Sequence, residues 1–129
     1  MKKSYLDSLI DAATQEGEVA EANLLLQEVE RFIDEKELVP EKVRVPAWMI
    51  YYNYIKWKQA NNETNILSRK GFFQYFKRYF HHYVDSGHIV YNVSKKTLDL
   101  SLTAKLEMRK MVREEREWYA KKRRRKKSE

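Results

Sequence analysis

Three histidines and a nearby carboxylate are the residues of this 129-residue chain whose types best suit metal chemistry. His81, His82 and His88 lie close together in sequence, with Asp85 between them. Imidazole and carboxylate groups are ordinary zinc ligands, but neighbouring residues on a helix point about 100° apart, so His81 and His82 cannot easily share one ion. The chain has no cysteine, which excludes a thiolate site and a cysteine nucleophile. We therefore predict no metal, no cofactor and no catalytic residue, and hence not an enzyme.

A cluster of cationic side chains carries a stronger signal. Lys70, Gln74, Lys77 and Arg78 recur at helical spacing, and this face of the expected helix contains no acid. Lysine and arginine there could neutralise phosphates, while Gln74 or Arg78 could contact base edges. The plainer interpretation is the water-facing side of an amphipathic helix. We favour nucleic-acid binding, because the lack of acids is unusual for a merely solvated face.

These residues need elements that hold them in place. Apolar spacing predicts a first helix from Tyr5 to Glu16, stopped by Gly17, and a second from Glu18 to about Glu37. A short strand around Val43 and Val45 precedes a largely buried helix from Ala47 to Ala60. After a polar turn, Ser68 is expected to cap the basic helix, Arg69 to His82. Its opposite face is aromatic: Phe72, Phe73, Phe76, Tyr79, Phe80 and Tyr83.

Two alternating segments follow the basic helix. Ile89, Tyr91 and Val93 form one, and Leu98, Leu100 and Leu102 form the other, separated by the turn Ser94-Lys95-Lys96. This spacing predicts a two-stranded ribbon with Lys95 and Lys96 at its tip. From about Thr103 the pattern becomes helical again, with dispersed apolar residues, so the first turns are expected to pack on the domain and later turns to project.

Two expectations concern exposure. The acids Glu28, Glu30, Asp34 and Glu35 are expected on a solvated helix face. Most aromatic residues at helical spacing should be core. The tyrosines expected to be exposed, where they could stack on unpaired bases, are Tyr52, Tyr75 and Tyr91.

The net charge of +7 conceals a gradient along the chain. Residues 1–41 hold 4 basic and 11 acidic side chains, whereas residues 105–129 hold 12 basic and 5 acidic ones. The run KKRRRKK, residues 121–127, must be solvated or bound to a polyanion, and its open roles are a phosphate clamp, a nuclear localisation signal or a solubility tail. No signal peptide or membrane-spanning run is evident, so we expect a cytoplasmic protein, in the host cell if it is viral.

These elements predict a mainly α fold with a small β-ribbon. Their order is that of a winged helix-turn-helix domain, with acidic helices before it and a basic helix and tail after it. We divide the chain into an acidic helical region (1–41), a winged-helix domain (42–102) and a basic C-terminal helix and tail (103–129). The predicted DNA-binding residues are Arg69, Lys70, Gln74, Lys77, Arg78, Lys95, Lys96, Lys121, Lys122, Arg123, Arg124 and Arg125.

The segments VRVPAWMIYYNYIKWKQANN and ILSRKGFFQYFKRYF resemble the C-terminal winged-helix domain of phage and plasmid primase–helicases, including the poxvirus primase-like group. The resemblance covers roughly residues 20–100. It rests on Val45-Pro46, on Tyr51, Tyr54 and Trp57, and on Leu67-Ser68-Arg69 followed by Phe72 and Phe73. No P-loop is present, so what the resemblance implies is a detached DNA-binding domain of viral or mobile-element origin without its motor.

The expected function is therefore binding of double-stranded DNA as an accessory of phage or mobile-element replication or regulation. Two alternatives stay open. One is a small viral protein-interaction module that docks on and inhibits or redirects a host enzyme, for which the acidic N-terminal helices or the C-terminal helix could be the contact. The other is an RNA-binding accessory that uses the same basic surfaces. No membrane role is expected.

Overall fold

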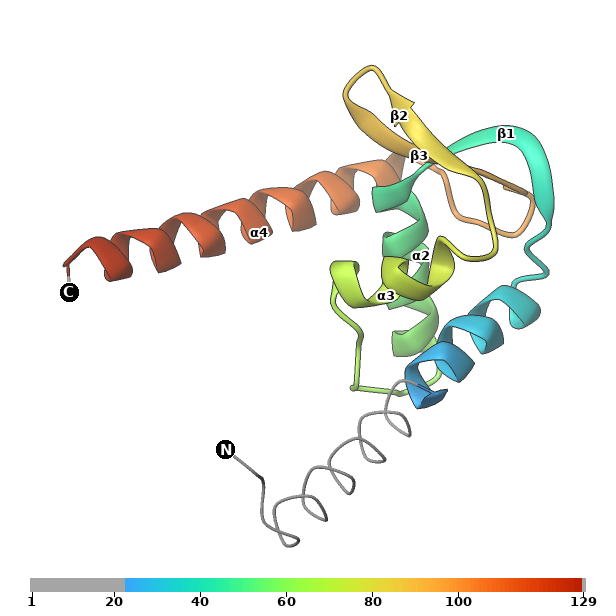
Figure 1. Ribbon diagram of the computed structural model, residues 1–129, viewed down its shortest axis with the longest axis horizontal. Helices are drawn as coiled ribbons and strands as arrows, with labels where there is room; N and C mark the ends of the chain where they lie inside the picture. Colours follow the sequence, from blue (N-terminus) through green and yellow to red (C-terminus); the bar gives the residue numbers. More distant parts are fainter. Residues whose placement is uncertain (1–22, 129) are drawn as a thin grey trace, which may run out of the picture.

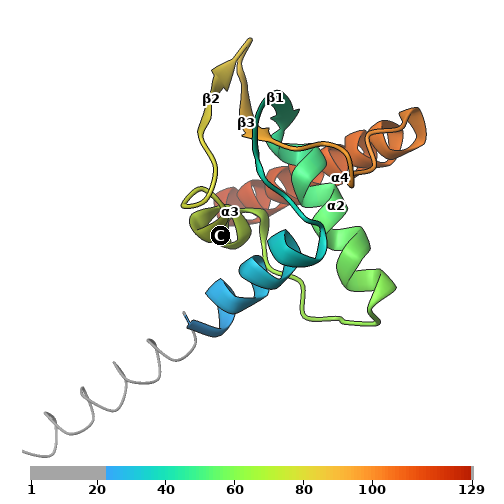
Figure 2. The same cartoon turned by 90° about the vertical axis from the view of Figure 1, so that its right-hand side faces the viewer.

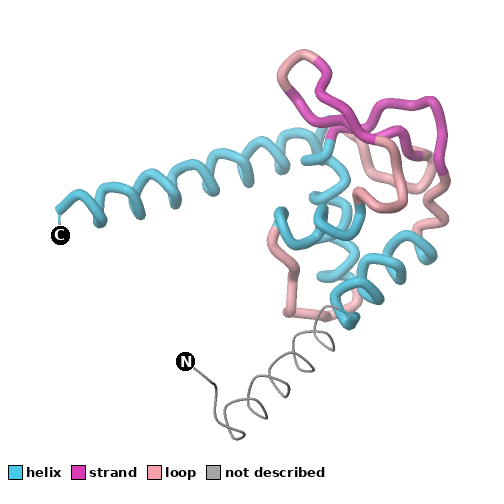
Figure 3. Tube along the Cα trace, in the orientation of Figure 1, coloured by secondary structure: helices cyan, strands magenta, loops and turns pink. Residues whose placement is uncertain are grey.

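The computed structural model describes residues 23–128, and their side chains as far as residue 125. The described chain is mainly helical, with one small three-stranded antiparallel sheet (Figures 1 and 3). Its elements in order are the helix of residues 23–35, β1 (Pro40–Pro46), α2 (Ala47–Ala60), α3 (Arg69–Phe76), β2 (His82–Asp85), β3 (His88–Val93) and α4 (Leu102–Ser128). The predicted helix from Tyr5 to Glu16 lies outside the described residues.

Helix α2 forms the centre of the core, as predicted, because apolar side chains occupy more than one of its faces. Ile50 and Tyr54 are fully buried. The helix of residues 23–35 packs on it through Val29 and Phe32, and α3 packs on it through Phe72. The Phe72 ring lies 4.6 Å from the Tyr54 ring and 5.8 Å from the Phe32 ring, centroid to centroid. Aromatic packing thus joins three helices in one core.

A buried ammonium group ties α2 to the helix of residues 23–35 and to the connection that leads into α3. Lys58 of α2 has a fully buried side chain, and its Nζ donates to Glu28, to Glu63 Oε2 at 2.6 Å and to Asn65 Oδ1 at 3.1 Å. Arg31 Nη2 contacts the same Glu63 carboxylate at 2.6 Å. A buried lysine needs such compensation because its charge has lost contact with water.

The expectation that the acids of this region form a solvated face holds for Asp34 and Glu35, which are exposed, whereas Glu28 and Glu30 are partly buried. Glu28 accepts from Tyr54 Oη at 2.8 Å in addition to Lys58. Glu35 accepts from Trp57 Nε1 at 2.6 Å, and Glu30 accepts from Tyr79 Oη at 2.5 Å. These carboxylates satisfy donors at the edge of the aromatic core, which apolar periodicity alone does not reveal.

The hairpin is built from different strands than predicted. β3 pairs with β2 on one side and with β1 on the other, so the sheet order is β1-β3-β2. The tip is the turn at Ser86 and Gly87, whose φ angles are 52° and 82°. Positive φ at both central residues is typical of the two-residue turns that match strand twist. The Leu98–Leu102 segment is not a strand: Asn53 of α2 hydrogen-bonds the backbone N–H and C=O of Asp99 in place of a partner strand.

Helix α3 ends at Phe76, earlier than the predicted His82. The spacing of Phe76, Phe80 and Tyr83 continues the helical period, but the chain turns after Lys77 and still buries Phe80. The expectation of exposed tyrosines is also wrong, since Tyr52, Tyr75 and Tyr91 are 4%, 7% and 3% exposed. Burial raises the pKa of Tyr91 to about 12.

Helix α4 starts against the core and then leaves it. Ala104 is buried and Met108 and Met111 pack on the core, whereas the later turns project from the body of the molecule (Figure 1). Figure 2 shows α4 crossing behind α2 and α3 in the turned view. This arrangement confirms the expectation that only the first turns pack. None of the helices in the described range has both the length and the hydrophobicity that crossing a bilayer requires.

Candidate nucleic-acid interface

The start of α3 is fixed by a cap. Ser68 Oγ accepts a hydrogen bond from the backbone N–H of Gly71 at 3.1 Å, which satisfies one of the free donors of the first turn and confirms the predicted cap. A side chain at position 71 would place its Cβ 3.2 Å from that oxygen, so glycine leaves room for the capping hydroxyl. The cap holds the helix in register with the aromatic core beneath it.

Three polar residues form the outer surface of α3, here called the α3 face: Lys70, Gln74 and Lys77. All three are exposed. They lie four and three residues apart, and Lys77 still has helical backbone angles, so their side chains share one side of the helix. Within the described residues, none of the three has an ion pair or hydrogen bond through its side chain. α3 contains no acid, so this face presents only positive charge and one amide.

The other two cations predicted on this helix are already engaged. Arg69 lies over the Trp48 ring, with Cζ 4.5 Å from its centroid, and its Nη2 pairs with Glu115 of α4 at 2.9 Å. Arg78 lies over the Tyr75 ring at 5.1 Å. Both stacks keep a guanidinium at the edge of the α3 face, where each can still offer donors.

Polar contacts hold α4 beside α2 and α3. Tyr52 Oη donates to Glu107, and Lys56 Nζ lies 3.2 Å from the same carboxylate. Burial and the bond to Glu107 raise the pKa of Tyr52 to about 12. The hydrogen bonds from Tyr52 and Lys56 lower the pKa of Glu107. Farther along α4, Glu115 reaches Arg69, so the basic half of α4 begins next to the start of α3.

The cations of the C-terminal tail belong to α4 and are exposed on its surface. Lys121, Lys122, Arg123, Arg124 and Arg125 are all exposed on α4. The prediction did not include the earlier exposed cations of α4, which are Lys105, Arg109, Lys110, Arg113 and Arg116. In the sequence these cations alternate with Glu107, Glu114 and Glu117, so no uniformly basic stretch indicates them. The structure shows that the exposed cations follow α4 from Lys105 to Arg125.

The structure does not bring Lys95 and Lys96 to this surface. They are exposed, but they lie in the connection between β3 and α4, and the expected position at the tip of a ribbon is wrong. The neighbouring Thr97 donates to the backbone carbonyl of Lys36, at the end of the helix of residues 23–35. The real tip carries no lysine. Near it Arg44 pairs with Asp85 at 2.7 Å, which raises the pKa of Arg44.

The histidines lie in and next to the strands β2 and β3. His82 stacks on Tyr91, His81 stacks on Tyr83, and His88 lies opposite Asp85 in the hairpin register. Among the described residues no group of three or more histidines and carboxylates is arranged to hold a metal ion. Imidazole rings stacked on tyrosines serve the packing of the sheet edge.

Comparison of the chain with protein-family models, with curated proteins and with solved structures gives no match.

The Arg69–Glu115 pair makes one prediction. Glu115→Gln removes the carboxylate that engages Arg69 and is expected to raise affinity for duplex DNA about threefold, and to steepen the salt dependence by roughly one counterion. Stability should change by less than about 1 kcal/mol, because the pair is partly exposed. Fluorescence anisotropy at several salt concentrations measures both binding quantities.

Glu114→Gln is the matched control, since Glu114 is exposed, adjacent and carries the same charge. An equal gain in both variants would show that net charge, and not the release of Arg69, sets the affinity.

Proposed function

We propose that this protein binds double-stranded DNA as a winged helix-turn-helix protein, with α3 as the helix that enters the major groove. The order of the elements from residue 23 to Val93, and the sheet order β1-β3-β2, are compatible with that architecture. The observation that carries the proposal is the α3 face. Lys70, Gln74 and Lys77 point outward without an acid among them, while Phe72 and Phe76 hold the opposite side in the core.

In this proposal Lys70 and Lys77 contact phosphates, and Gln74 is placed to read a base edge. Glutamine can bond adenine in the major groove through two hydrogen bonds. Arg69 and Arg78 flank the face, and the cations of α4 follow the backbone beyond it. The hairpin β2–β3 is the wing, and its exposed Val84 and Ile89 are a cross-strand pair at its tip. Apolar contact with a groove wall is the role such a tip supports.

The biological setting in the proposal rests on the resemblance to the C-terminal domain of primase–helicases. It assigns the protein to phage or mobile-element replication or regulation. The alternative of a protein-interaction module gains little from the described part of the acidic region, because Glu28, Glu30 and Glu35 are directed to donors of the body.

The experiment is a titration of labelled duplex DNA, single-stranded DNA and RNA at two salt concentrations. We expect the parent to bind duplex with strong salt dependence. The triple variant Lys70→Ala, Lys77→Ala, Arg78→Ala should bind roughly tenfold or more weakly and lose about three counterions from the salt slope. These residues are exposed, so the variant should keep its fold, which circular dichroism will check.

The matched control removes three exposed lysines of β1 and of the connection between β3 and α4: Lys42→Ala, Lys95→Ala, Lys96→Ala. It should retain most of the affinity. If the control loses as much as the triple variant, charge alone determines binding and α3 is not the contact. If RNA binds better than duplex in the parent, the RNA-binding alternative replaces the DNA proposal.

A further inference from the structure

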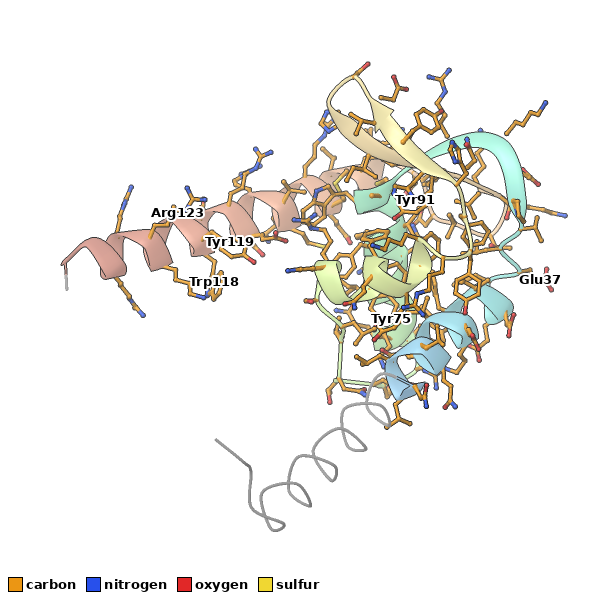
Figure 4. All side chains as sticks on the ribbon, viewed as in Figure 1. Glu37, Tyr75, Tyr91, Trp118, Tyr119 and Arg123 are labelled. Atoms are coloured by element: carbon orange, nitrogen blue, oxygen red, sulfur yellow. The ribbon has the colours of Figure 1, made fainter. Side chains whose placement is uncertain are left out.

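One face of α4 changes character along its length. Met108 and Met111 of this face pack on the core, and Glu115 pairs with Arg69 at the start of α3. Residues three and four positions apart lie on the same side of a helix, so Trp118 and Tyr119 continue the face of Glu115. Figure 4 shows both side chains on the side of α4 that faces α3, beyond the body of the molecule.

These two rings are large, apolar and open. Trp118 is 56% exposed and Tyr119 is 45% exposed, and they pack edge to face with centroids 4.8 Å apart. Within the described residues, neither has a ring contact or hydrogen bond with another element. Adjacent exposed rings form a continuous apolar area, and continuous exposed apolar area is a feature of interaction sites.

The charge around the rings selects the kind of ligand. Lys122 Nζ lies 5.0 Å from the centre of the Trp118 ring, and Lys121 and Arg123 flank it on the helix. The sequence is cationic without interruption from 121 to 127. Aromatic rings beside cations are what single-stranded nucleic acids require, because bases stack on the rings while phosphates follow the charge. A second copy of the same segment would be repelled by the same seven charges.

We propose that Trp118 and Tyr119 bind unpaired nucleobases of a strand that continues from the duplex held by α3. This inference rests on the proposed function and names its substrate: a junction between duplex and single strand. Bases within a duplex are stacked on each other, so rings on a rigid helix can reach only bases that are unpaired. Trp118 and Tyr119 follow Glu115 by about one helical turn, so they lie roughly 5 Å along α4 from the contact between Glu115 and Arg69.

The test compares four labelled ligands: a blunt duplex, the same duplex with a DNA overhang of about eight nucleotides, the same duplex with an RNA overhang of that length, and the isolated DNA strand. Anisotropy of the full chain should show roughly tenfold tighter binding to an overhang than to the blunt end. Trp118→Ala, Tyr119→Ala should lose this preference and bind blunt duplex within about twofold of the parent. The two overhangs tell whether the strand is DNA or RNA.

The matched control is Leu102→Ala, Leu106→Ala, which trims two other exposed apolar residues of α4, 71% and 55% exposed. It should keep the overhang preference. Alanine is the best helix former, so both double variants should keep α4 helical. The single variant Trp118→Tyr should retain most of the overhang preference of the parent, because tyrosine also stacks on bases.

Several results would overturn the inference. One is a parent that binds blunt and overhang duplex equally. Another is an overhang preference that survives in Trp118→Ala, Tyr119→Ala, in which case α3 binding stands and the single strand is read elsewhere. A third is sedimentation equilibrium that shows a dimer in the parent and a monomer in that variant, which would make the aromatic pair a self-association surface. A parent that needs Trp118 and Tyr119 for single strands but ignores duplex would support the aromatic site and refute the α3 proposal.

Discussion

Phe72→Ala is expected to destabilise the fold more than any other single change considered for this chain, by about 4 kcal/mol. The Phe72 side chain is fully buried where α2, α3 and the helix of residues 23–35 meet, so alanine leaves a cavity that three rigid elements cannot close. Thermal unfolding followed by circular dichroism should show the midpoint falling by about 15 °C.

Gln74→Ala is the comparison on the same helix. Gln74 is exposed, so its loss should alter stability by less than about 0.5 kcal/mol. If Gln74 reads a base edge as proposed, its loss should instead reduce the preference for particular DNA sequences. If Phe72→Ala unfolds at nearly the same temperature as Gln74→Ala, α3 is not packed on the aromatic core and the α3 face has no rigid support.

Lys58→Ala is the second large prediction, with an expected loss of about 3 kcal/mol in the free energy of unfolding. The lysine is buried, and its removal leaves the Glu28 and Glu63 carboxylates near each other without their shared cation. The loss is placed at the low end for a broken buried pair, since both carboxylates keep some contact with water. Urea unfolding at neutral pH measures it.

The same variant should show a characteristic pH dependence. Burial alone would lower the pKa of Lys58, but the bonds to Glu28 and Glu63 outweigh it and raise that pKa above its ordinary 10.5. Bonds from Arg31 and Lys58 lower the pKa of Glu63 below its ordinary 4.5. The contribution of this cluster is therefore complete between about pH 4.5 and 10.5, lost on the acid side as Glu63 is protonated and on the alkaline side as Lys58 is deprotonated.

The difference in stability between the parent and Lys58→Ala should thus shrink below pH 4.5. Lys42→Ala is the control, because Lys42 is exposed and, among the described residues, its side chain has no ion pair, so its effect on stability should not change with pH. A difference that stays constant from pH 7 to pH 3.5 would show that the loss in Lys58→Ala comes from its hydrocarbon chain and not from its charge.

Much of the fold follows from local signals. The bounds Ala47 and Ala60 of α2 and the cap at Ser68 were predicted correctly, because a dense apolar pattern and a hydroxyl before a basic helix act within a few residues. The start of α4 was predicted to within one residue. The predictions were wrong where contacts between residues distant in the sequence determine the local structure. The helical period past Phe76 hid strand β2, and the alternation from Leu98 to Leu102 mimicked a strand that Asn53 replaces.

The candidate site divides in the same way. Exposure of Lys70, Gln74 and Lys77 was predictable, since it depends on the period of one helix. The ion pair between Arg69 and Glu115 was not predictable, because 46 residues separate the two in sequence. Lys95 and Lys96 were predicted at a ribbon tip because Leu98–Leu102 was predicted to be the partner strand of β3. The prediction of exposed aromatic residues named three buried tyrosines and did not include Trp118 and Tyr119 of α4.

The length of α4 has a consequence for how the molecule moves in solution. Its 27 residues make a rod of roughly 40 Å, longer than the ~30 Å diameter of a small domain. A monomer with such a rod has a larger hydrodynamic radius than a sphere of 15.7 kDa and elutes early from a sizing column, as a dimer would. Its rotation is also slower about axes across the rod than about the rod itself. Light scattering or sedimentation, which do not assume a sphere, are therefore the right measures of its mass.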